Sequence, residues 1–188
     1  MGFSNYPAWM AQKMFDIQNR SGQARFIRAQ MYYSLLSRDL EHDVAPFLEE
    51  SGLGLMVWSP LASGFLSGKY TREDPKPAGS RRVKFDFPPV DVDKGYVLID
   101  RLREFGSKYG ASIPQIALAW VLARPVVSTV LIGASNAGQL KDNLAAESVV
   151  LSAKDIQFLD DLTEPYVPYP AMMLPMGWDA KIKEALGR

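Results

Sequence analysis

The sequence predicts an α/β protein built on a parallel sheet. Short apolar runs alternate along the chain with segments in which apolar residues recur every three or four positions. This alternation is typical of strands joined by crossover helices. The run at residues 53–58 is apolar throughout, which indicates a strand covered on both faces.

Two strand–helix units and a third strand are predicted in the first third of the chain. A proline lies where the first helix begins, and a glycine follows each helix end. Gly2 and Phe3 read as the last residues of a strand whose beginning is missing. The predicted elements are strand 2–3, helix 7–21, strand 25–33, helix 41–50 and strand 53–58.

A long irregular stretch, residues 60–92, follows the third strand and is rich in glycine and proline. A connection of this length inside a compact domain is usually a functional or mobile loop. Helices resume at residues 94–109 and after Ser112, which forms a predicted capping box with Gln115.

The last part of the chain adds a fourth strand and two helices. Ser152 and Asp155 are predicted to form a second capping box, which begins the last helix. Residues 165–188 read as a tail rich in Pro, Tyr and Met that lies across a surface. The other elements are strand 126–132, a turn at 133–136 and a helix that extends to Leu144.

The strand count predicts about half of a closed barrel. Three whole strands and the end of a fourth are each followed by helix, whereas an eightfold barrel usually needs about 250 residues. The 188 residues are therefore expected to form a single incomplete domain (1–188), a partial (β/α)8 TIM barrel. Because an unclosed barrel exposes strand edges, self-association or pairing with the missing half is expected.

Composition excludes several classes of function. Basic and acidic residues are 21 each, so neither nucleic acid nor an anionic membrane surface is expected as a partner. Without cysteine there is no disulfide, thiolate nucleophile or Cys-based metal site, and no metal site is predicted. No apolar run approaches the roughly 20 residues of a membrane span. The amino terminus lacks a signal-peptide pattern, and a cytoplasmic protein is expected.

Polar residues gather just after the predicted strands. Ligands of parallel α/β proteins bind at the carboxyl ends of strands, so this placement is expected of a ligand site. The same residue types also cap helices and form turns, and the pattern alone leaves both interpretations open. The residues are Ser4, Asn5, Gln30, Ser59, Ser63, Ser135 and Asn136.

Four local sequences, one after each successive strand, together resemble the aldo/keto reductase family. They are GFSN (2–5), AQMYYSLL (29–36), VWSPLASGFLSGKY (57–70) and IGASNAGQLKDN (132–143). Their order along the chain makes the match specific, and it covers nearly the whole chain, fading after about Leu162. The resemblance implies roughly the last four β/α units of the family's barrel.

The resemblance also implies a nicotinamide cofactor, NADP(H), with NAD(H) as the alternative. Ser4, Asn5 and Gln30 match the residues that hold the nicotinamide carboxamide, whose acceptor and donors suit amide and hydroxyl side chains. Gln30 is alternatively a satisfied buried amide. Trp58 matches the aromatic residue on which the nicotinamide stacks, although a core Trp is the commoner role.

The resemblance assigns the rest of the dinucleotide to two further segments. Backbone N–H groups of the loop and one lysine suit a pyrophosphate, although a lone lysine is more often a solvated charge. The matching residues are Ser59, Pro60, Leu61, Ala62, Ser63 and Lys69. Arg81 resembles the family's arginine near the adenosine ribose phosphate, and Arg82 leaves open which of the two makes contact.

The helix that begins near Asn136 matches the adenosine end of the family's site. A helix amino terminus favours an anion such as a 2′-phosphate. The matching residues are Gly133, Ser135, Gln139, Asp142 and Asn143. Some relatives carry Arg where Gln139 stands, and a bidentate Arg binds phosphate more strongly. This departure weakens the expected preference for NADPH over NADH.

By this resemblance the function is an NADP(H)-dependent oxidoreductase that reduces aldehydes and ketones to alcohols. The family's catalytic Tyr, Lys, Asp and His precede the GFSN segment, so no catalytic residue is assigned here, and the 188 residues alone are expected to be a poor reductase or inactive. The tyrosines at 6, 32 and 33 are not carried over, and His42 is expected to be a solvated helix residue.

Two other functions stay open. The chain is alternatively a non-catalytic nicotinamide-nucleotide-binding or regulatory subunit, because the family includes channel-associated subunits, or else an inactive fragment. The substrate of the completed protein, a small carbonyl compound, is not defined by the sequence. Met172, Met173 and Trp178 either contribute to its pocket or merely pack.

Overall fold

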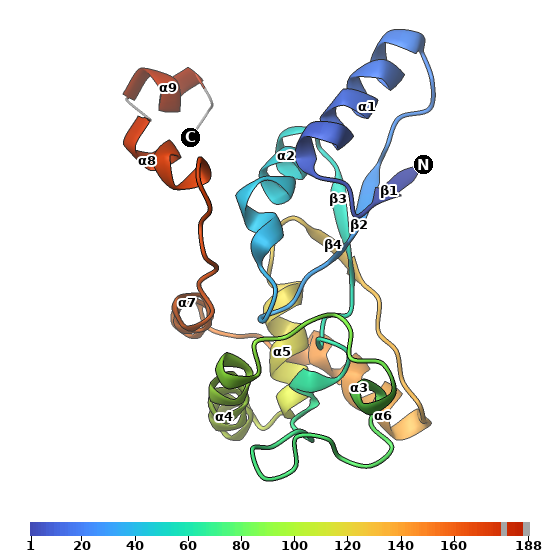
Figure 1. Cartoon of the computed structure of the whole chain (residues 1–188), viewed down its shortest axis with the longest axis vertical. Coiled ribbons are helices and arrows are strands. Elements are labelled where there is room, and N and C mark those ends of the chain that lie inside the picture. The colour runs from blue at the N-terminus through green and yellow to red at the C-terminus, as the bar shows by residue number, and fades with distance from the viewer. Residues whose placement is uncertain (178–179, 186–188) are drawn as a thin grey trace.

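A computed structural model describes residues 1–177 and 180–185 (Figure 1). The strands are β1 (Gly2–Ser4), β2 (Arg28–Tyr32), β3 (Gly54–Trp58) and β4 (Val127–Val130). The main helices are α1 (Ala8–Ser21), α2 (Val44–Glu50), α4 (Val92–Tyr109), α5 (Ile113–Leu122), α6 (Ala137–Leu144) and α7 (Ala153–Leu162). Shorter helical segments are η1 (Asp39–His42), η2 (Phe65–Ser67), α3 (Arg81–Lys84), η3 (Ala145–Ser148), η4 (Ala171–Met173), α8 (Leu174–Gly177) and α9 (Ala180–Ala185).

The strands form one four-stranded sheet in the order β1-β2-β3-β4. Every neighbouring pair is parallel, with Ser4 opposite Gln30 and Tyr32 opposite Trp58. Each connection therefore crosses over through a helical segment, and the α/β class predicted from the sequence is confirmed. Since all strands run in one direction, their carboxyl ends and the following loops meet at one edge of the sheet (Figure 1).

One face of the sheet is buried beneath the helices. Alternate side chains of β2 and β3 belong to the core, among them Met31, Leu55 and Val57, which are at most 5% exposed. On the opposite face Met56 and Trp58 are only half-buried. The expectation that residues 53–58 are covered on both faces is therefore wrong: among the described residues, a full layer covers one face only.

The predicted helix 41–50 is divided into η1 and α2. The break lies at Asp43, whose backbone angles (φ −140°, ψ −46°) are not helical. Pro46 explains the new start, because a proline lacks the N–H that continues a helix but is tolerated in the first turn. Asp43 also accepts a hydrogen bond from the Ala8 amide at 3.3 Å, which links the two helices α1 and α2.

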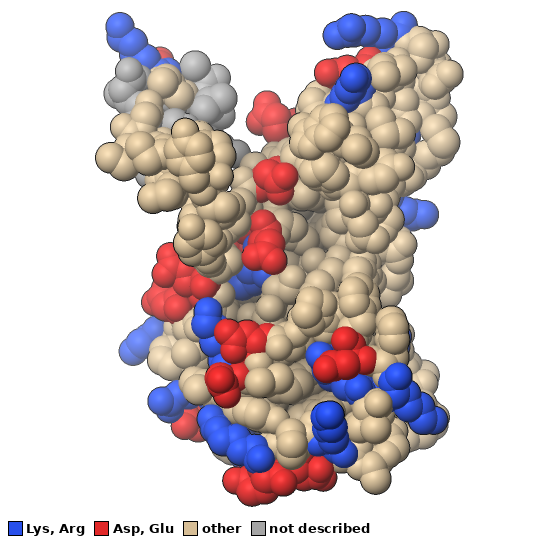
Figure 2. All heavy atoms as spheres, in the orientation of Figure 1, with Lys and Arg blue, Asp and Glu red and all other residues tan. Residues whose placement is uncertain are grey.

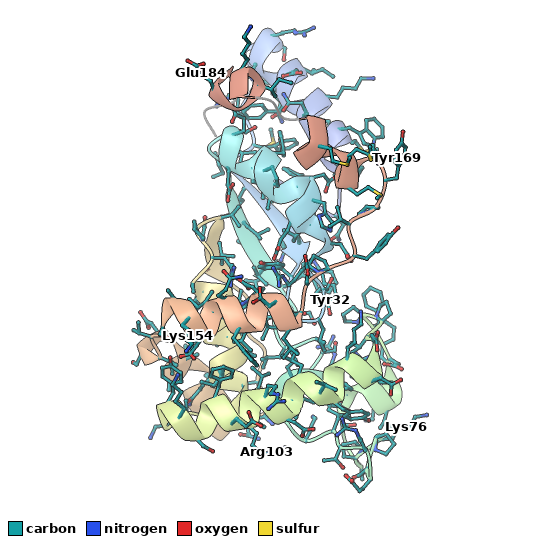
Figure 3. The ribbon with its side chains drawn as sticks, turned by 90° about the vertical axis from the view of Figure 1, so that its left-hand side faces the viewer. Tyr32, Lys76, Arg103, Lys154, Tyr169 and Glu184 are labelled. Atoms are coloured by element: carbon teal, nitrogen blue, oxygen red, sulfur yellow. The ribbon has the colours of Figure 1, made fainter. Side chains whose placement is uncertain are left out.

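Of the two predicted capping boxes, one forms completely. Ser112 accepts from the Gln115 amide and Gln115 Oε1 accepts from the Ser112 amide. At α7 the Ser152 hydroxyl accepts from the Asp155 amide, but the Ser152 amide donates to Tyr109 Oη at 2.9 Å. The shorter Asp155 side chain instead binds Lys108 and Tyr109, and so fastens α7 to α4. Figure 3 shows these two helices side by side.

The long stretch 60–92 is irregular as predicted, but contains the short segments η2 and α3. The tail leaves α7 in an extended run with Tyr166 and Tyr169 about four-fifths exposed (82% and 77%), and α8 and α9 follow it (Figure 1).

His42 is half-buried rather than solvated, and its Nε2 lies 3.0 Å from the Tyr166 carbonyl oxygen of the tail. Met172 and Met173 are exposed, and Trp178 lies outside the described residues.

Basic and acidic side chains are interspersed over the face shown in Figure 2. This mixing agrees with the zero net charge and leaves no large single-signed patch on that face. In the described part of the chain, no helix has the length and apolar character needed to span a membrane. Within the same residues, no three His, Asp or Glu side chains are grouped as metal ligands.

Candidate functional site

The loops that follow β3 and β4 enclose a groove of about 1080 Å³. Its wall contains most of the site residues expected from the sequence, brought together from positions more than 80 residues apart. They are Trp58, Ser59, Pro60, Leu61, Ser63, Lys69, Arg81, Gly133, Ser135, Gln139, Asp142 and Asn143. The wall does not include Ser4, Asn5, Gln30 or Ala62, and Ala62 is fully buried beneath the loop.

Ser4 and Asn5 lie instead at the carboxyl end of β1, and Gln30 lies opposite Ser4 in the middle of β2. The Ser4 hydroxyl donates to the Gln30 carbonyl oxygen at 2.7 Å, and Trp58 Nε1 donates to Asn5 Oδ1 at 3.3 Å. The second bond joins this strand-end cluster to the groove through Trp58. The Gln30 carboxamide forms no hydrogen bond with a described residue, so the alternative of a satisfied buried amide is not supported.

Trp58 lies among aromatic rings rather than in the core. Its ring centroid is 5.0 Å from that of Tyr32 and 6.2 Å from that of Phe87, with interplanar angles of 29° and 18°. Figure 3 shows Tyr32 at the level where the strands end and the lower helices begin. Burial raises the pKa of Tyr32, the opposite of what a phenolic general acid needs at neutral pH.

The backbone around these loops is strained. Within the described residues, the only non-glycine positions with positive φ are Asn5 (59°), Ser59 (54°), Ala62 (49°) and Ser63 (55°). Each such residue costs on the order of 1 kcal/mol. All of these positions were selected from the sequence as site residues. Strain that is tolerated at one place in a fold marks that place as a candidate functional site.

The turn after β3 satisfies its own amide groups. The Ala62 amide donates to the Ser59 carbonyl, the Ser63 amide to Ser59 Oγ, and the Gly64 amide to the Leu61 carbonyl, all at 2.9 Å. These three N–H groups are therefore already engaged within the turn. A positive charge beside the turn comes from Lys69, which is exposed and lines the groove.

The two adjacent arginines of the long loop have different environments. Arg82 Nη1 donates to the carbonyls of Ala62 (3.1 Å) and Pro88 (2.9 Å), and Nη2 pairs with Asp86. The Arg82 side chain is only 8% exposed and holds the loop in place. Arg81 is exposed and lines the groove. The structure therefore makes Arg81, not Arg82, the arginine that is accessible to a ligand.

The amino terminus of α6 forms the far end of the groove. Asn136 Oδ1 accepts from the Gln139 amide (2.9 Å), and Gln139 Oε1 accepts from the Ser135 amide (2.8 Å). The carboxylate of Asp142 accepts from Ser112 Oγ and Gln115 Nε2, both at 2.8 Å, and so attaches α6 to the capping box of α5.

Asn143 differs from its neighbours. Its side chain lines the groove and is only 8% exposed, yet it hydrogen bonds with none of the described residues. Its side-chain amide nitrogen and oxygen keep accessible surface, so they face the groove and are open to a ligand partner. The edge of an adenine ring offers an amino donor and a ring-nitrogen acceptor that an Asn side chain can bind together.

The groove is positive although the protein is neutral. Lys69, Arg81 and Lys84 line it, whereas its acidic residue, Asp142, is already hydrogen-bonded through both oxygens. Unpaired cations in a concave site favour an anionic ligand. Sequence reasoning missed Ser80, Lys84 and Phe87 of the wall, because they lie in an irregular loop where no periodicity indicates which side chains face inward.

The fold and the groove define an α/β protein whose ligand site crosses the carboxyl ends of parallel strands. The chain belongs to the aldo/keto reductase family, whose model matches residues 1–164. Members of this family are oxidoreductases that generally bind nicotinamide cofactors.

Three relatives illustrate the range of the family. The chain is 30% identical to versiconal hemiacetal acetate reductase of Aspergillus parasiticus, over 89% of this chain and 48% of the relative. It is 32% identical to the NADH-specific methylglyoxal reductase of Escherichia coli (76% and 43%). It is 34% identical to a probable voltage-gated potassium channel subunit beta of Oryza sativa (79% and 47%). The chain thus spans about half the length of the curated relatives it matches.

Proposed function

We propose that this chain supplies the cofactor cradle of an NADP(H)-dependent oxidoreductase that reduces aldehydes and ketones to alcohols. In this proposal Ser4, Asn5 and Gln30 bind the nicotinamide carboxamide and Trp58 stacks against the ring. The bound cofactor would supply the hydride. The chain's own contribution is to bind the dinucleotide along the groove and to present one face of its ring.

The observation that carries the proposal is the unpaired Asn143 carboxamide, which is open to a cation-lined groove although the residue is only 8% exposed. An adenine edge would pair with Asn143, and Lys69 and Arg81 would neutralise the phosphates. The Gln30 carboxamide, which has no partner among the described residues, would bind the carboxamide at the other end, where Asn5 accepts a hydrogen bond from Trp58. A ligand with an adenine at one end, phosphates in the middle and a carboxamide at the other fits these groups.

We further infer that residues 1–188 correspond to about the last four β/α units of a (β/α)8 barrel, with residues 165–188 as a tail. Four sequential parallel strands support this. Pairing with the complementary half, or self-association, would cover the edges of the sheet at β1 and β4. The catalytic acid–base residues are proposed to lie outside this stretch, and a cytoplasmic location stays a prediction.

The relatives also support an alternative. Resemblance to a potassium channel subunit beta favours a nucleotide-binding regulatory subunit, and the NADH-specific relative favours NADH as cofactor. Either function would use the same groove. Turnover of a reactive aldehyde with NADPH separates the two, because a regulatory subunit paired with the complementary half would bind the cofactor without appreciable turnover.

Titration of the full chain with NADPH and NADH, followed by tryptophan fluorescence, tests the cradle. Asn143→Leu removes a hydrogen-bonding group and should weaken binding by about tenfold, the equivalent of one lost hydrogen bond. Asn19→Leu, on the exposed side of α1, is the matched control and should bind as the wild type does. The proposal fails if neither dinucleotide binds the wild-type chain, or if both variants bind equally well.

A further inference from the structure

We propose that Met31 is a positioning residue for the nicotinamide end of the site. Its thioether sulfur fixes the backbone of Asn5, and through that backbone the side chain that binds the carboxamide. This inference rests on the proposed function, since it concerns the Asn5 group of the same cradle. It adds Met31, to which the resemblance assigns no role, to the residues on which cofactor binding depends.

A hydrogen bond joins the end of β1 to the side chain of β2. The Asn5 amide donates to Met31 Sδ, with 3.1 Å between nitrogen and sulfur. Asn5 follows the last residue of β1, and Ser4 is paired with Gln30, so the amide reaches the next residue along β2. A thioether is a weak acceptor, but a leucine of similar size would accept no bond at all. The partly buried amide would then lose its partner.

The backbone of Asn5 needs such a contact because it is left-handed (φ 59°). Asn is one of the few residues besides Gly that adopt this conformation. At Ala62 and Ser63 the positive φ is accompanied by amide hydrogen bonds within the turn after β3. Asn5 is held instead from other strands, at its amide by Met31 and at Oδ1 by Trp58 Nε1 (3.3 Å). Both ends of the residue are therefore fixed.

These two contacts leave one group of the Asn5 side chain available. Its Oδ1 accepts from Trp58, whereas its Nδ2 donates to none of the described residues. The oxygen of a carboxamide is an acceptor that this NH₂ group can bind. A change in the Asn5 backbone would move that donor and the bond to Trp58 together. The effect of losing the sulfur should therefore appear at the nicotinamide.

Met31 does not touch the ligand itself. Its side chain is 5% exposed, belongs to the core and is not part of the groove wall. Gln30 precedes it in β2, and consecutive side chains of a strand point to opposite faces of the sheet. Any influence of Met31 on the cofactor must therefore pass through Asn5 or through the stability of the whole fold. Ligands without a nicotinamide distinguish these two routes.

Dissociation constants for two pairs of ligands, measured by calorimetry on the full chain, test the proposal. NADPH is compared with 2′-phospho-ADP-ribose, and NADH with ADP-ribose, because each pair differs only in the nicotinamide. Met31→Leu nearly conserves the side-chain volume. It should weaken dinucleotide binding by about fivefold, the equivalent of one weak hydrogen bond, and binding of the nicotinamide-free ligands by less than about twofold.

Met14→Leu is the matched control. It is the same substitution at a partly buried position of α1 that packs against the core, and it should bind all four ligands as the wild type does. Amide hydrogen exchange of the wild-type chain gives a second measurement that needs no variant. The Asn5 amide should exchange more slowly than the amide of Tyr6, its exposed neighbour, and this protection should be lost in Met31→Leu.

Each outcome has a distinct meaning. Weakening confined to the dinucleotides, together with a protected Asn5 amide, supports the positioning role. Equal weakening within each pair, a Met31→Leu variant that binds as the wild type does, or an unprotected Asn5 amide in the wild type would overturn that role while leaving the proposed function intact. If Met31→Leu does not fold, exchange of the wild-type Asn5 amide decides. If the wild-type chain binds neither dinucleotide, both proposals fall.

Discussion

Replacement of Arg82 by Gln is predicted to destabilise the loop at residues 60–92, which forms one wall of the groove. Arg82 donates to the carbonyl oxygens of Ala62 and Pro88, and its side chain is 8% exposed. Hydrogen bonds from a charged group contribute about 1.5–3 kcal/mol each. The pair with Asp86, whose carboxylate is 72% exposed, adds less than about 1 kcal/mol. Because both bonds come from the single nitrogen Nη1, we take the lower value for each, and the expected loss is about 3–4 kcal/mol.

Arg81→Gln is the matched control, because the neighbouring arginine is exposed and its side chain bonds to none of the described residues. Its free energy of unfolding should stay within about 0.5 kcal/mol of the wild type. For a chain of this size a loss of 3–4 kcal/mol corresponds to a melting temperature about 10 °C lower.

Urea denaturation measures the global effect, and hydrogen exchange of the amides in residues 60–92 measures the local one. If the loop opens without global unfolding, exchange should accelerate there in Arg82→Gln while the urea midpoint moves less. The reasoning is refuted if Arg82→Gln matches the wild type in both measurements, or if Arg81→Gln is the more destabilised variant.

Two further predictions concern the packing of α7. Asp160 accepts hydrogen bonds from Trp120 and Arg124, so Asp160→Ala should lower the free energy of unfolding by about 3–5 kcal/mol, because it leaves the half-buried Arg124 unpaired. The control is Asp161→Ala, at an exposed neighbouring position, which should cost under about 0.5 kcal/mol. Equal urea midpoints for the two variants would contradict this prediction. Hydrogen bonds from Lys108, Tyr109 and Ser152 lower the pKa of Asp155 from 3.8 to about 2. The unfolded chain therefore binds the proton more readily, and this contribution to stability is complete above about pH 4 and lost as the pH falls towards 2. Asp155→Asn should lack that part of the pH dependence in urea unfolding curves, and parallel curves for the two proteins would refute the assignment.

The order and type of the elements could be predicted because they depend on local patterns. The apolar run of β3, the complete capping box at Ser112 and the glycine-ended helices are all present. The break between η1 and α2 and the burial of only one face of the sheet could not be predicted, because they depend on neighbours far along the chain. Asp155 pairs with Lys108 rather than with the Ser152 amide because α4 packs against α7, and no pattern around residue 155 indicates that contact.

Only part of the candidate site could be predicted from the sequence. Residues in motifs that directly follow a strand could be located, because parallel topology brings strand ends together. The groove residues Ser80, Lys84 and Phe87 could not be located, since the course of their loop depends on the attachment of Arg82 to carbonyls in two different segments. The sequence also could not distinguish Arg81 from Arg82, because identical neighbours acquire different roles only when one of them becomes buried.

The groove of a chain without net charge is lined by three cations, Lys69, Arg81 and Lys84, and by one acidic residue, Asp142. Both oxygens of Asp142 accept hydrogen bonds from neutral groups at the start of α5, and these contacts also hold α6 in place. The groove is therefore positive because of which side chains face it, whatever the balance of charge over the whole chain. Net composition therefore argues against an extended polyanion surface, but it does not argue against a small anionic ligand. For such a ligand the decisive quantity is the number of unpaired cations that face the groove, among them Lys69 and Lys84.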